Sequence, residues 1–160
     1  MYIHTFASTM KLEQAIQSTK FKSEVQKCVL HILYTSWWLK TSMTQELKQF
    51  GITHEQYNVL RILKGKHPEQ MCIKDIGSRM IEKSSNVPRI IDRLETKKLV
   101  KRCTSSSDKR ETVVTLTNGG IALLYASTLI IDAKSEEQFT ITEEEAVTLN
   151  RLLEKLRNVE

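Results

Sequence analysis

The stretch SSNVPRIIDRLETKKLVKR, residues 84–102, predicts an amphipathic helix with one apolar and one basic face. The apolar positions recur every three or four residues and predict packing on a core: Val87, Ile90, Ile91 and Leu94. The opposite stripe combines three cations with one amide: Asn86, Arg89, Arg93 and Lys97. Side chains of these types reach both phosphates and base edges from a helix in the major groove of DNA. An ordinary surface helix also has a charged face, so the flanking sequence decides between the two interpretations.

The start of this helix carries two serines, Ser84 and Ser85, and we expect one of them to be its cap. Pro88 falls near the first turn, where a backbone N–H has no partner within the helix, so it does not break the helix. Further upstream, Thr53 and Gln56 form a T-x-x-Q capping box that begins another helix.

Two short helices therefore precede the stretch. The first begins at the capping box and ends at Gly65, and the second follows a short strand at 71–73 and is marked by Ile73, Ile76 and Met80. Short helices joined by a tight turn, the last with a basic exposed face, are typical of a helix-turn-helix. Residues 99–103 and 112–116 then predict a hairpin with a polar, basic tip at 104–111. A basic hairpin in this place is typical of a wing, which lays cationic side chains into the minor groove.

Three further helices are predicted outside this region. Residues 21–50 are apolar on two sides, residues 121–131 are apolar nearly all round, and Thr142 with Glu145 forms a second capping box before a leucine stripe. We expect a mainly α fold with a small β-hairpin wing, a winged helix-turn-helix plus a helical dimerisation region. The expected organisation is an N-terminal helical dimerisation segment at 1–50, a DNA-binding domain at 51–117, and C-terminal helices at 118–160 that complete the dimerisation region.

Charge is segregated along the chain, although the net charge of +5 over 160 residues is modest. Between Lys83 and Arg102 there are seven basic residues against two acidic ones, Asp92 and Glu95. Such segregation is expected of a protein with one nucleic-acid face. The chain has three widely spaced cysteines, no leader-like N-terminus and no apolar run long enough to span a bilayer. We expect a soluble, cytoplasmic protein with no membrane partner.

The sequence contains no recognisable catalytic constellation, and we expect neither enzyme activity, nor a cofactor, nor a bound metal. The four histidines show no HExxH pairing, and no nucleotide-binding glycine pattern or nucleophile elbow is present. Cys28 and His31 share a helix face and have the spacing of a metal pair or of a sensor thiol with its base. A buried thiol beside an imidazole is the favoured interpretation, because cysteine is among the most buried residues.

These motifs resemble those of the MarR family of winged helix-turn-helix regulators. The match covers about residues 51–120 and is carried by Gly51-Ile52-Thr53 with Gln56-Tyr57-x-Val59-Leu60, by Ile73-x-x-Ile76-x-x-Arg79-Met80, by the run from Ser85 to Arg102, by Asp108-x-Arg110, and by Leu116-Thr117-x-x-Gly120. The chain departs from the family pattern at Lys98, where the family usually has glycine. The outer helices agree with the family in type and order only.

The resemblance implies a homodimer that binds a pseudo-palindromic site in double-stranded DNA and usually represses a promoter. It also implies release by a small aromatic or phenolic effector. The implied DNA-binding residues are Ser84, Ser85, Asn86, Pro88, Arg89, Arg93, Lys97, Asp108, Lys109 and Arg110. Among them, Asn86 and Arg89 are expected to contact bases, and Lys97 to contact a phosphate or to be a solvated charge. The resemblance implies that Arg110 enters the minor groove and that Asp108 either orients Arg110 or braces the wing.

Three aromatic residues are candidates for the effector pocket: Tyr34, Trp37 and Trp38. Aromatic side chains suit flat apolar ligands, but filling the dimer core is the better-supported role for them. Two alternative functions stay open. One is a regulator switched by oxidation of Cys28, and the other is a winged-helix adapter that binds an acidic protein without specific DNA binding.

Overall fold

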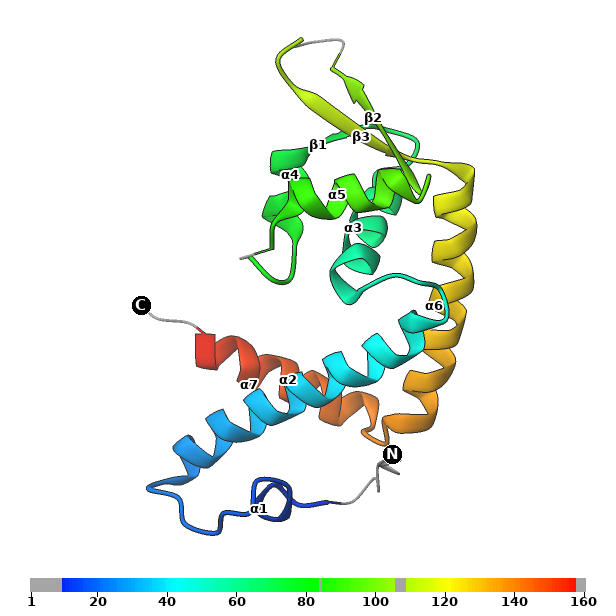
Figure 1. The fold of residues 1–160 in the computed structure, drawn as a ribbon. Coiled ribbons are helices and arrows are strands. Elements are labelled where there is room, and N and C mark those ends of the chain that lie inside the picture. The colour runs from blue at the N-terminus through cyan, green and yellow to red at the C-terminus, as the bar shows by residue number, and fades with distance from the viewer. Residues whose placement is uncertain (1–9, 84, 106–108, 158–160) are drawn as a thin grey trace.

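The sequence pattern produces a mostly helical chain in the structure, a computed structural model that describes residues 10–83, 85–105 and 109–157 (Figure 1). The helices are α1 (Leu12–Ala15), α2 (Glu24–Lys48), α3 (His54–Lys64), α4 (Ile73–Arg79), α5 (Val87–Thr96), α6 (Asn118–Gln138) and α7 (Glu143–Arg157). The strands are β1 (Met71–Cys72), β2 (Val100–Thr104) and β3 (Thr112–Leu116). They form one antiparallel sheet in the order β1-β3-β2. The predicted fold class, mainly α with a small β-hairpin wing, is confirmed.

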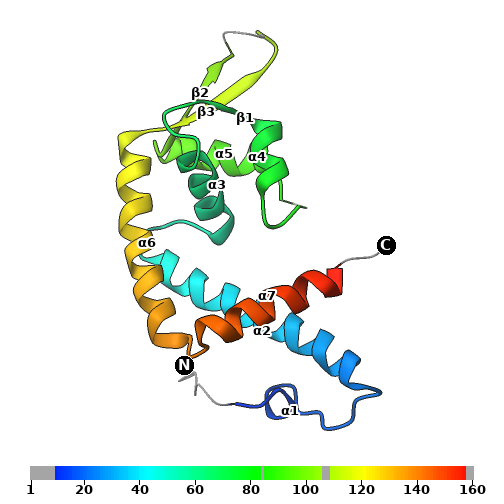
Figure 2. The ribbon, with the colours of Figure 1, turned by 180° about the vertical axis from the view of Figure 1, so that it is seen from behind.

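Two regions of the chain are joined by α6. At one end α3, α4 and α5 lie under the small sheet, and at the other end α2 and α7 extend from α6 toward the same side (Figures 1 and 2). Helix α6 contacts α3 and β3 in the first region and α2 in the second. This long helix therefore connects the sheet region to the outer helices, α2 and α7. No helix among the described residues is both long enough and apolar enough to cross a membrane.

The core lies in the region of the sheet and the short helices. Its fully buried side chains come from different elements: Leu60 of α3, Ile76 of α4, Ile91 and Leu94 of α5, and Val114 of β3. Burying a side chain of this size stabilises a fold by about 1.5–3 kcal/mol. The predicted apolar face of α5 is confirmed, and Ile90 at its edge is half-buried. Helix α5 is thereby held in one rotational setting.

Most predicted helix starts are confirmed by hydrogen bonds. The Thr53–Gln56 capping box begins α3, with Gln56 N donating to Thr53 Oγ1 over 3.3 Å and Thr53 N donating to Gln56 Oε1 over 3.1 Å. Thr142 and Glu145 form the same reciprocal pair before α7. The turn after α2 places Gly51 at a φ of 65°, a left-handed conformation that glycine adopts without strain.

The expected serine cap of α5 is wrong. Asn86 is the cap, and its Oδ1 accepts a hydrogen bond from the backbone N–H of Arg89 over 3.2 Å. Pro88 has no N–H to offer, so the third residue of the helix supplies the donor. Ser85 instead lies one residue before the cap, and Ser84 lies outside the described residues.

Candidate nucleic-acid interface

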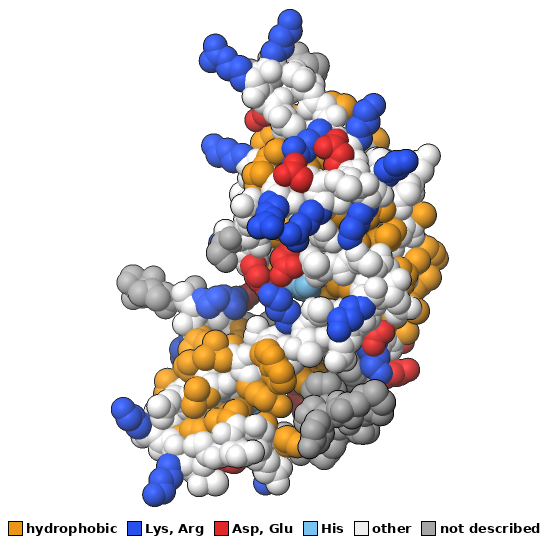
Figure 3. Space-filling view, in the orientation of Figure 1, with side chains coloured by type: hydrophobic (Ala, Val, Ile, Leu, Met, Phe, Trp, Pro, Cys, Tyr) orange, Lys and Arg blue, Asp and Glu red, His pale blue; other side chains and the backbone are white. Residues whose placement is uncertain are grey.

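Helix α5 presents its predicted basic stripe to solvent. Asn86, Arg89, Arg93 and Lys97 are all exposed, whereas the core face of the same helix is buried. Lysine and arginine side chains gather over α5 and continue to the end of the wing (Figure 3). The helix is therefore fixed by its apolar face with a cationic face turned outward, which is the arrangement that groove binding needs.

A cleft of about 300 Å³ brings four of the predicted residues together between α3 and α5. Its lining residues are Thr53, Glu55, Gln56, Glu82, Ser85, Asn86, Arg89, Ile90 and Arg93. Arg89 and Arg93 lie on the same cleft as Glu55 and Glu82, so the basic stripe borders an acidic wall. The cationic face of α5 is thereby bounded on one side by carboxylates.

The cap role of Asn86 limits how it can contact a base. Its Oδ1 accepts the Arg89 N–H, and only its amide nitrogen is left to donate. Reading adenine with both atoms of the amide would use the second lone pair of the same oxygen, so the cap and the base would both have to suit one side-chain orientation. The cap therefore restricts the base contact that the sequence predicts for Asn86, whereas Arg89 has no such restriction on its side chain.

Lys97 is tied back to the protein although its side chain is exposed. Its Nζ donates to the Gly51 carbonyl oxygen, and it lies 3.3 Å from Gln56 Oε1 in the capping box of α3. The ammonium thus joins the end of α5 to the turn between α2 and α3. This geometry gives Lys97 a structural role, where the sequence suggested a phosphate contact.

The wing is a regular hairpin. Strands β2 and β3 pair from Val100 with Leu116 to Thr104 with Thr112, and Ser105 N donates to the Glu111 carbonyl over 2.9 Å. Lys109 and Arg110 are exposed beyond this pair. Asp108 lies outside the described residues, so its expected contact with Arg110 stays a prediction. The hairpin therefore carries two of the predicted cations away from the core.

Arg102 is a residue that the sequence pattern did not single out. It lies in β2 and contacts α5 through Pro88, Asp92 and Glu95. Two sequence signals included it without giving it a role: the excess of basic residues between Lys83 and Arg102, and the end of the run from Ser85 to Arg102 that resembles the MarR family.

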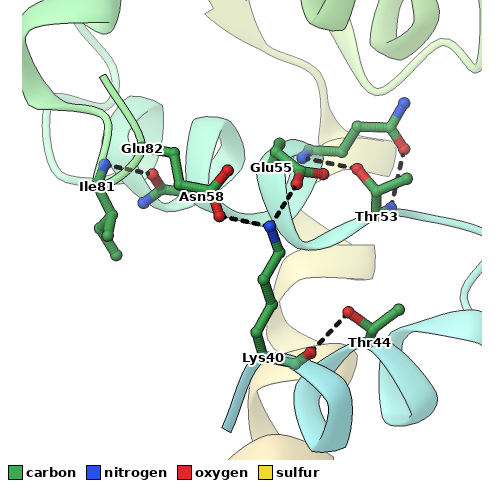
Figure 4. Close-up of polar contacts among 8 residues, drawn as sticks. Lys40, Thr44, Thr53, Glu55, Asn58, Ile81 and Glu82 are labelled. Carbon is green, nitrogen blue, oxygen red and sulfur yellow. Dashed lines mark hydrogen bonds and ion pairs between the residues drawn. The ribbon is translucent and has the colours of Figure 1, made fainter. Parts of the chain in front are cut away.

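The acidic wall of the cleft is joined to α2 by Lys40 (Figure 4). Lys40 Nζ lies 2.5 Å from Glu82 Oε1 and 3.4 Å from Glu55 Oε1. The hydrogen bond that the Lys40 ammonium donates to Glu82 raises the pKa of Lys40 above its ordinary value. Burial raises the pKa of Glu55, but the hydrogen bonds from its own backbone, Thr53 and Lys40 outweigh it and lower the pKa. His54, Glu55 and Glu82 also place ligand atoms within 4.8 Å of one another, where the Lys40 ammonium already supplies a positive charge.

The three predicted effector residues separate into two groups. Tyr34 and Trp37 form a tilted ring pair with centroids 5.5 Å apart, whereas Trp38 meets Phe139 edge-on at 6.3 Å. A cavity of about 620 Å³ lies elsewhere, between α3 and α6. Its lining residues are Arg61, Lys64, Asn118, Ile121, Ala122, Leu124, Tyr125 and Thr128. The sequence did not single out this cavity, because its lining comes from segments about 55 residues apart that only folding brings together.

The thiol of Cys28 is exposed, so the favoured interpretation of a buried thiol is wrong for the single chain. His31 is exposed as well. The reason is that Val25 and Val29, which share this face of α2 with Cys28, are themselves uncovered. An apolar helix face buries a cysteine only where another element packs on it.

Comparison with known proteins agrees with this geometry. A model of the MarR family matches residues 52–112. The HTH-type transcriptional regulator SarZ of Staphylococcus aureus is 30% identical over 115 residues, which are 72% of this chain and 74% of SarZ. The structure of MepR of S. aureus in complex with DNA aligns with a TM-score of 0.72 at 28% identity, covering 86% of this chain and 97% of that one. AbsC of Streptomyces coelicolor, a MarR family regulator, shares the fold with a TM-score of 0.76 at 22% identity, over 86% of this chain and 95% of AbsC. The chain belongs to the MarR family of winged-helix, DNA-binding transcriptional regulators.

Proposed function

We propose that this regulator binds a pseudo-palindromic DNA site as a homodimer and represses the promoter that contains it. The observation that carries the proposal is the exposed pair Arg89 and Arg93 on a helix whose apolar face is locked in the core. The wing cations Lys109 and Arg110 extend from the same region and suit the neighbouring minor groove. The S. aureus MepR structure with DNA is a precedent in a relative.

The proposed dimer explains a large exposed apolar surface on α2, α6 and α7. Its members are Val25, Val29, Leu33 and Trp37 of α2, Tyr125, Leu129 and Ile130 of α6, and Val147, Leu149, Leu152 and Leu156 of α7. Monomeric proteins rarely expose so many large apolar side chains on neighbouring helices. Segments 1–50 and 118–160 would therefore form the dimerisation region around the DNA-binding domain at 51–117.

A small aromatic or phenolic effector is the third part of the proposal. The cavity between α3 and α6 supports it, since its lining combines apolar side chains of α6 with the cations Arg61 and Lys64 of α3. Arg61 Nη1 donates to the Tyr57 hydroxyl over 3.2 Å, and that hydroxyl lies 3.0 Å from Thr128 Oγ1. A flat anion placed here would contact both α3 and α6. It would therefore act where α6 packs on the sheet region that it connects to α2 and α7.

Oxidation of Cys28 is not included in the proposal. Cys28 lies between Val25 and Val29 on the α2 face that the proposed dimer covers. The dimer would therefore restrict access of an oxidant to the thiol.

The test is selection of bound duplexes from a random pool by the purified protein at near-physiological salt. We expect an inverted repeat with half-sites about one helical turn apart. The double variant Arg89→Ala/Arg93→Ala is the control and should recover no motif. If the unaltered protein recovers only salt-sensitive background binding, sequence-specific regulation is wrong and the acidic-partner adapter becomes the better account.

A further inference from the structure

Arg102 links the wing to helix α5 at several points. Its Nη2 lies 2.6 Å from Asp92 Oδ1 and donates to the Pro88 carbonyl oxygen over 2.9 Å. Its Nε lies 3.6 Å from Glu95 Oε2, and its backbone N–H donates to Glu95 Oε1 over 3.0 Å. Pro88, Asp92 and Glu95 are four and three residues apart and share one face of the helix. One side chain of the wing therefore spans two turns of α5.

The position of Arg102 in the strand explains why it faces α5. Side chains alternate along a strand, so Arg102 lies on the same face as Val100, which is buried in the core. Arg102 pairs with Val114 at the centre of the β2–β3 ladder, and Val114 is fully buried. The hairpin is thus attached to the core at Val100 and to the helix at Arg102, two points that together restrain its rotation.

The contacts also change the charge that a polyanion would meet. Asp92 and Glu95 are the two acidic residues of α5, and their side chains are 60% and 42% exposed. Both would repel phosphates, and the Arg102 guanidinium lies beside both. Because a guanidinium is planar with several fixed donors, it can contact two carboxylates and a carbonyl together in a way that a lysine ammonium does not reproduce.

We propose that Arg102 is a positioning residue for DNA binding: it fixes the wing relative to α5 so that Arg110 and Arg89 reach neighbouring grooves in one register. The inference rests on the proposed function. Arg102 acts through the placement of the wing and not through its own contact with DNA.

The first test uses Asp92→Asn, which separates positioning from charge. Loss of a negative charge next to DNA would by electrostatics alone tighten binding. Loss of the anchor for Arg102 would weaken it. We expect Asp92→Asn to bind the selected duplex about threefold to tenfold more weakly, since one charge-assisted contact is lost. Equal or tighter binding would overturn the proposal.

The second test is a double-mutant cycle between Arg102→Met and Arg110→Ala, measured by fluorescence anisotropy on the same duplex. Each single change should weaken binding by about tenfold or more, and Arg110→Ala should weaken it by less than about threefold once Arg102 is replaced. Lys101→Met is the matched control, because it removes one charge from the neighbouring, outward-facing position of β2. Multiplicative effects of Arg102→Met and Arg110→Ala, or an equal effect of Lys101→Met, would contradict positioning.

A measurement without DNA tests the restraint of the wing by Arg102 independently of the proposed function. Hydrogen exchange of the backbone amides in 100–104 and 112–116 should become faster in Arg102→Met and in Arg102→Lys, and stay unchanged in Lys101→Met. Far-UV circular dichroism establishes that each variant is folded. Unchanged exchange in both Arg102 variants would show that Arg102 does not restrain the wing. Faster exchange, in a protein that selects no DNA motif, would contradict only the role of Arg102 in DNA binding.

Discussion

The Lys40 ammonium of α2 lies 2.5 Å from a carboxylate oxygen of Glu82, which lies in the turn before α5. The two residues are 42 positions apart in the chain and belong to the outer helices and to the helix-turn-helix, respectively. A second carboxylate, that of Glu55 at the start of α3, lies 3.4 Å from the same ammonium. One cation therefore joins the proposed dimerisation region to two elements of the DNA-binding region.

The stability that this ion pair contributes should depend on pH at both ends of the range. The Lys40 pKa is raised, so its contribution is complete below the ordinary lysine pKa and is lost as pH rises through the folded value. The Glu55 pKa is lowered, so its contribution is present above the ordinary glutamate pKa and is lost as pH falls through the folded value.

Lys40→Met should therefore lower the free energy of unfolding near neutral pH by less than about 1 kcal/mol, because the charged groups are partly exposed and screened. The difference in free energy of unfolding between Lys40→Met and the unaltered protein should become smaller at pH values below the glutamate pKa range and above the lysine pKa range. Chemical denaturation across pH measures it, with Lys48→Met of the same helix as the control. A difference that does not change with pH would contradict the ion-pair account.

Asn86→Ala should lose the cap of α5 and destabilise the protein by about 1 kcal/mol. Asn86→Ser keeps a side-chain acceptor at the same position and should retain most of that stability. If Asn86 also contacts a base, both variants should lose about 1–3 kcal/mol of discrimination at one position of the site. Denaturation and competition binding separate the two roles, and equal stability of the alanine and serine variants would refute the cap.

Replacing Arg89 should chiefly affect DNA binding and replacing Lys97 should chiefly affect stability, although both residues belong to the exposed stripe. Arg89→Ala should weaken binding to the selected duplex by about 1–3 kcal/mol and relax base preference. Lys97→Ala should chiefly lower stability, because it removes the contacts with Gly51 and Gln56. Binding measured against salt concentration distinguishes them. A change of about one unit in the salt slope for Lys97→Ala would restore the phosphate contact expected from the sequence.

Lys98→Gly should stabilise the protein by about 1 kcal/mol. Lys98 ends α5 at a φ of 59°, a left-handed conformation that is strained for any residue with a Cβ atom. Glycine adopts this conformation without the strain, and alanine does not. Thermal denaturation of Lys98→Gly beside Lys98→Ala measures the difference, and a glycine variant no more stable than the alanine variant would argue against it.

Gly120→Ala should destabilise the protein by about 3 kcal/mol or more, because a Cβ atom there would lie 2.0 Å from the Leu99 carbonyl oxygen. The neighbouring Gly119→Ala is a matched control, since its added Cβ would meet nothing closer than 3.6 Å. The absence of a Cβ atom at Gly120 therefore allows α6 to begin this close to the end of α5. Similar stabilities of the two variants would show that the backbone at residue 99 yields easily.

The sequence predicted those features that depend on residues a few positions apart. The spacing of Ile91 and Leu94 placed the buried face of α5, and the pairs Thr53–Gln56 and Thr142–Glu145 placed two helix starts. The cap of α5 was missed because three consecutive residues, Ser84, Ser85 and Asn86, are all good caps. Pro88 removes one N–H donor, and backbone geometry then selects among the three.

By itself, the sequence determined the order of the helices, the wing and the outward basic stripe, since each follows from local periodicity and capping. Only the tertiary structure decided that Lys97 is tied to Gly51, that Lys40 joins Glu82, and that Arg102 reaches back over α5. The first two contacts join residues 46 and 42 positions apart. Which long cation meets which acceptor over such separations is set by how the buried faces pack, because that packing fixes where the flexible charged side chains can reach.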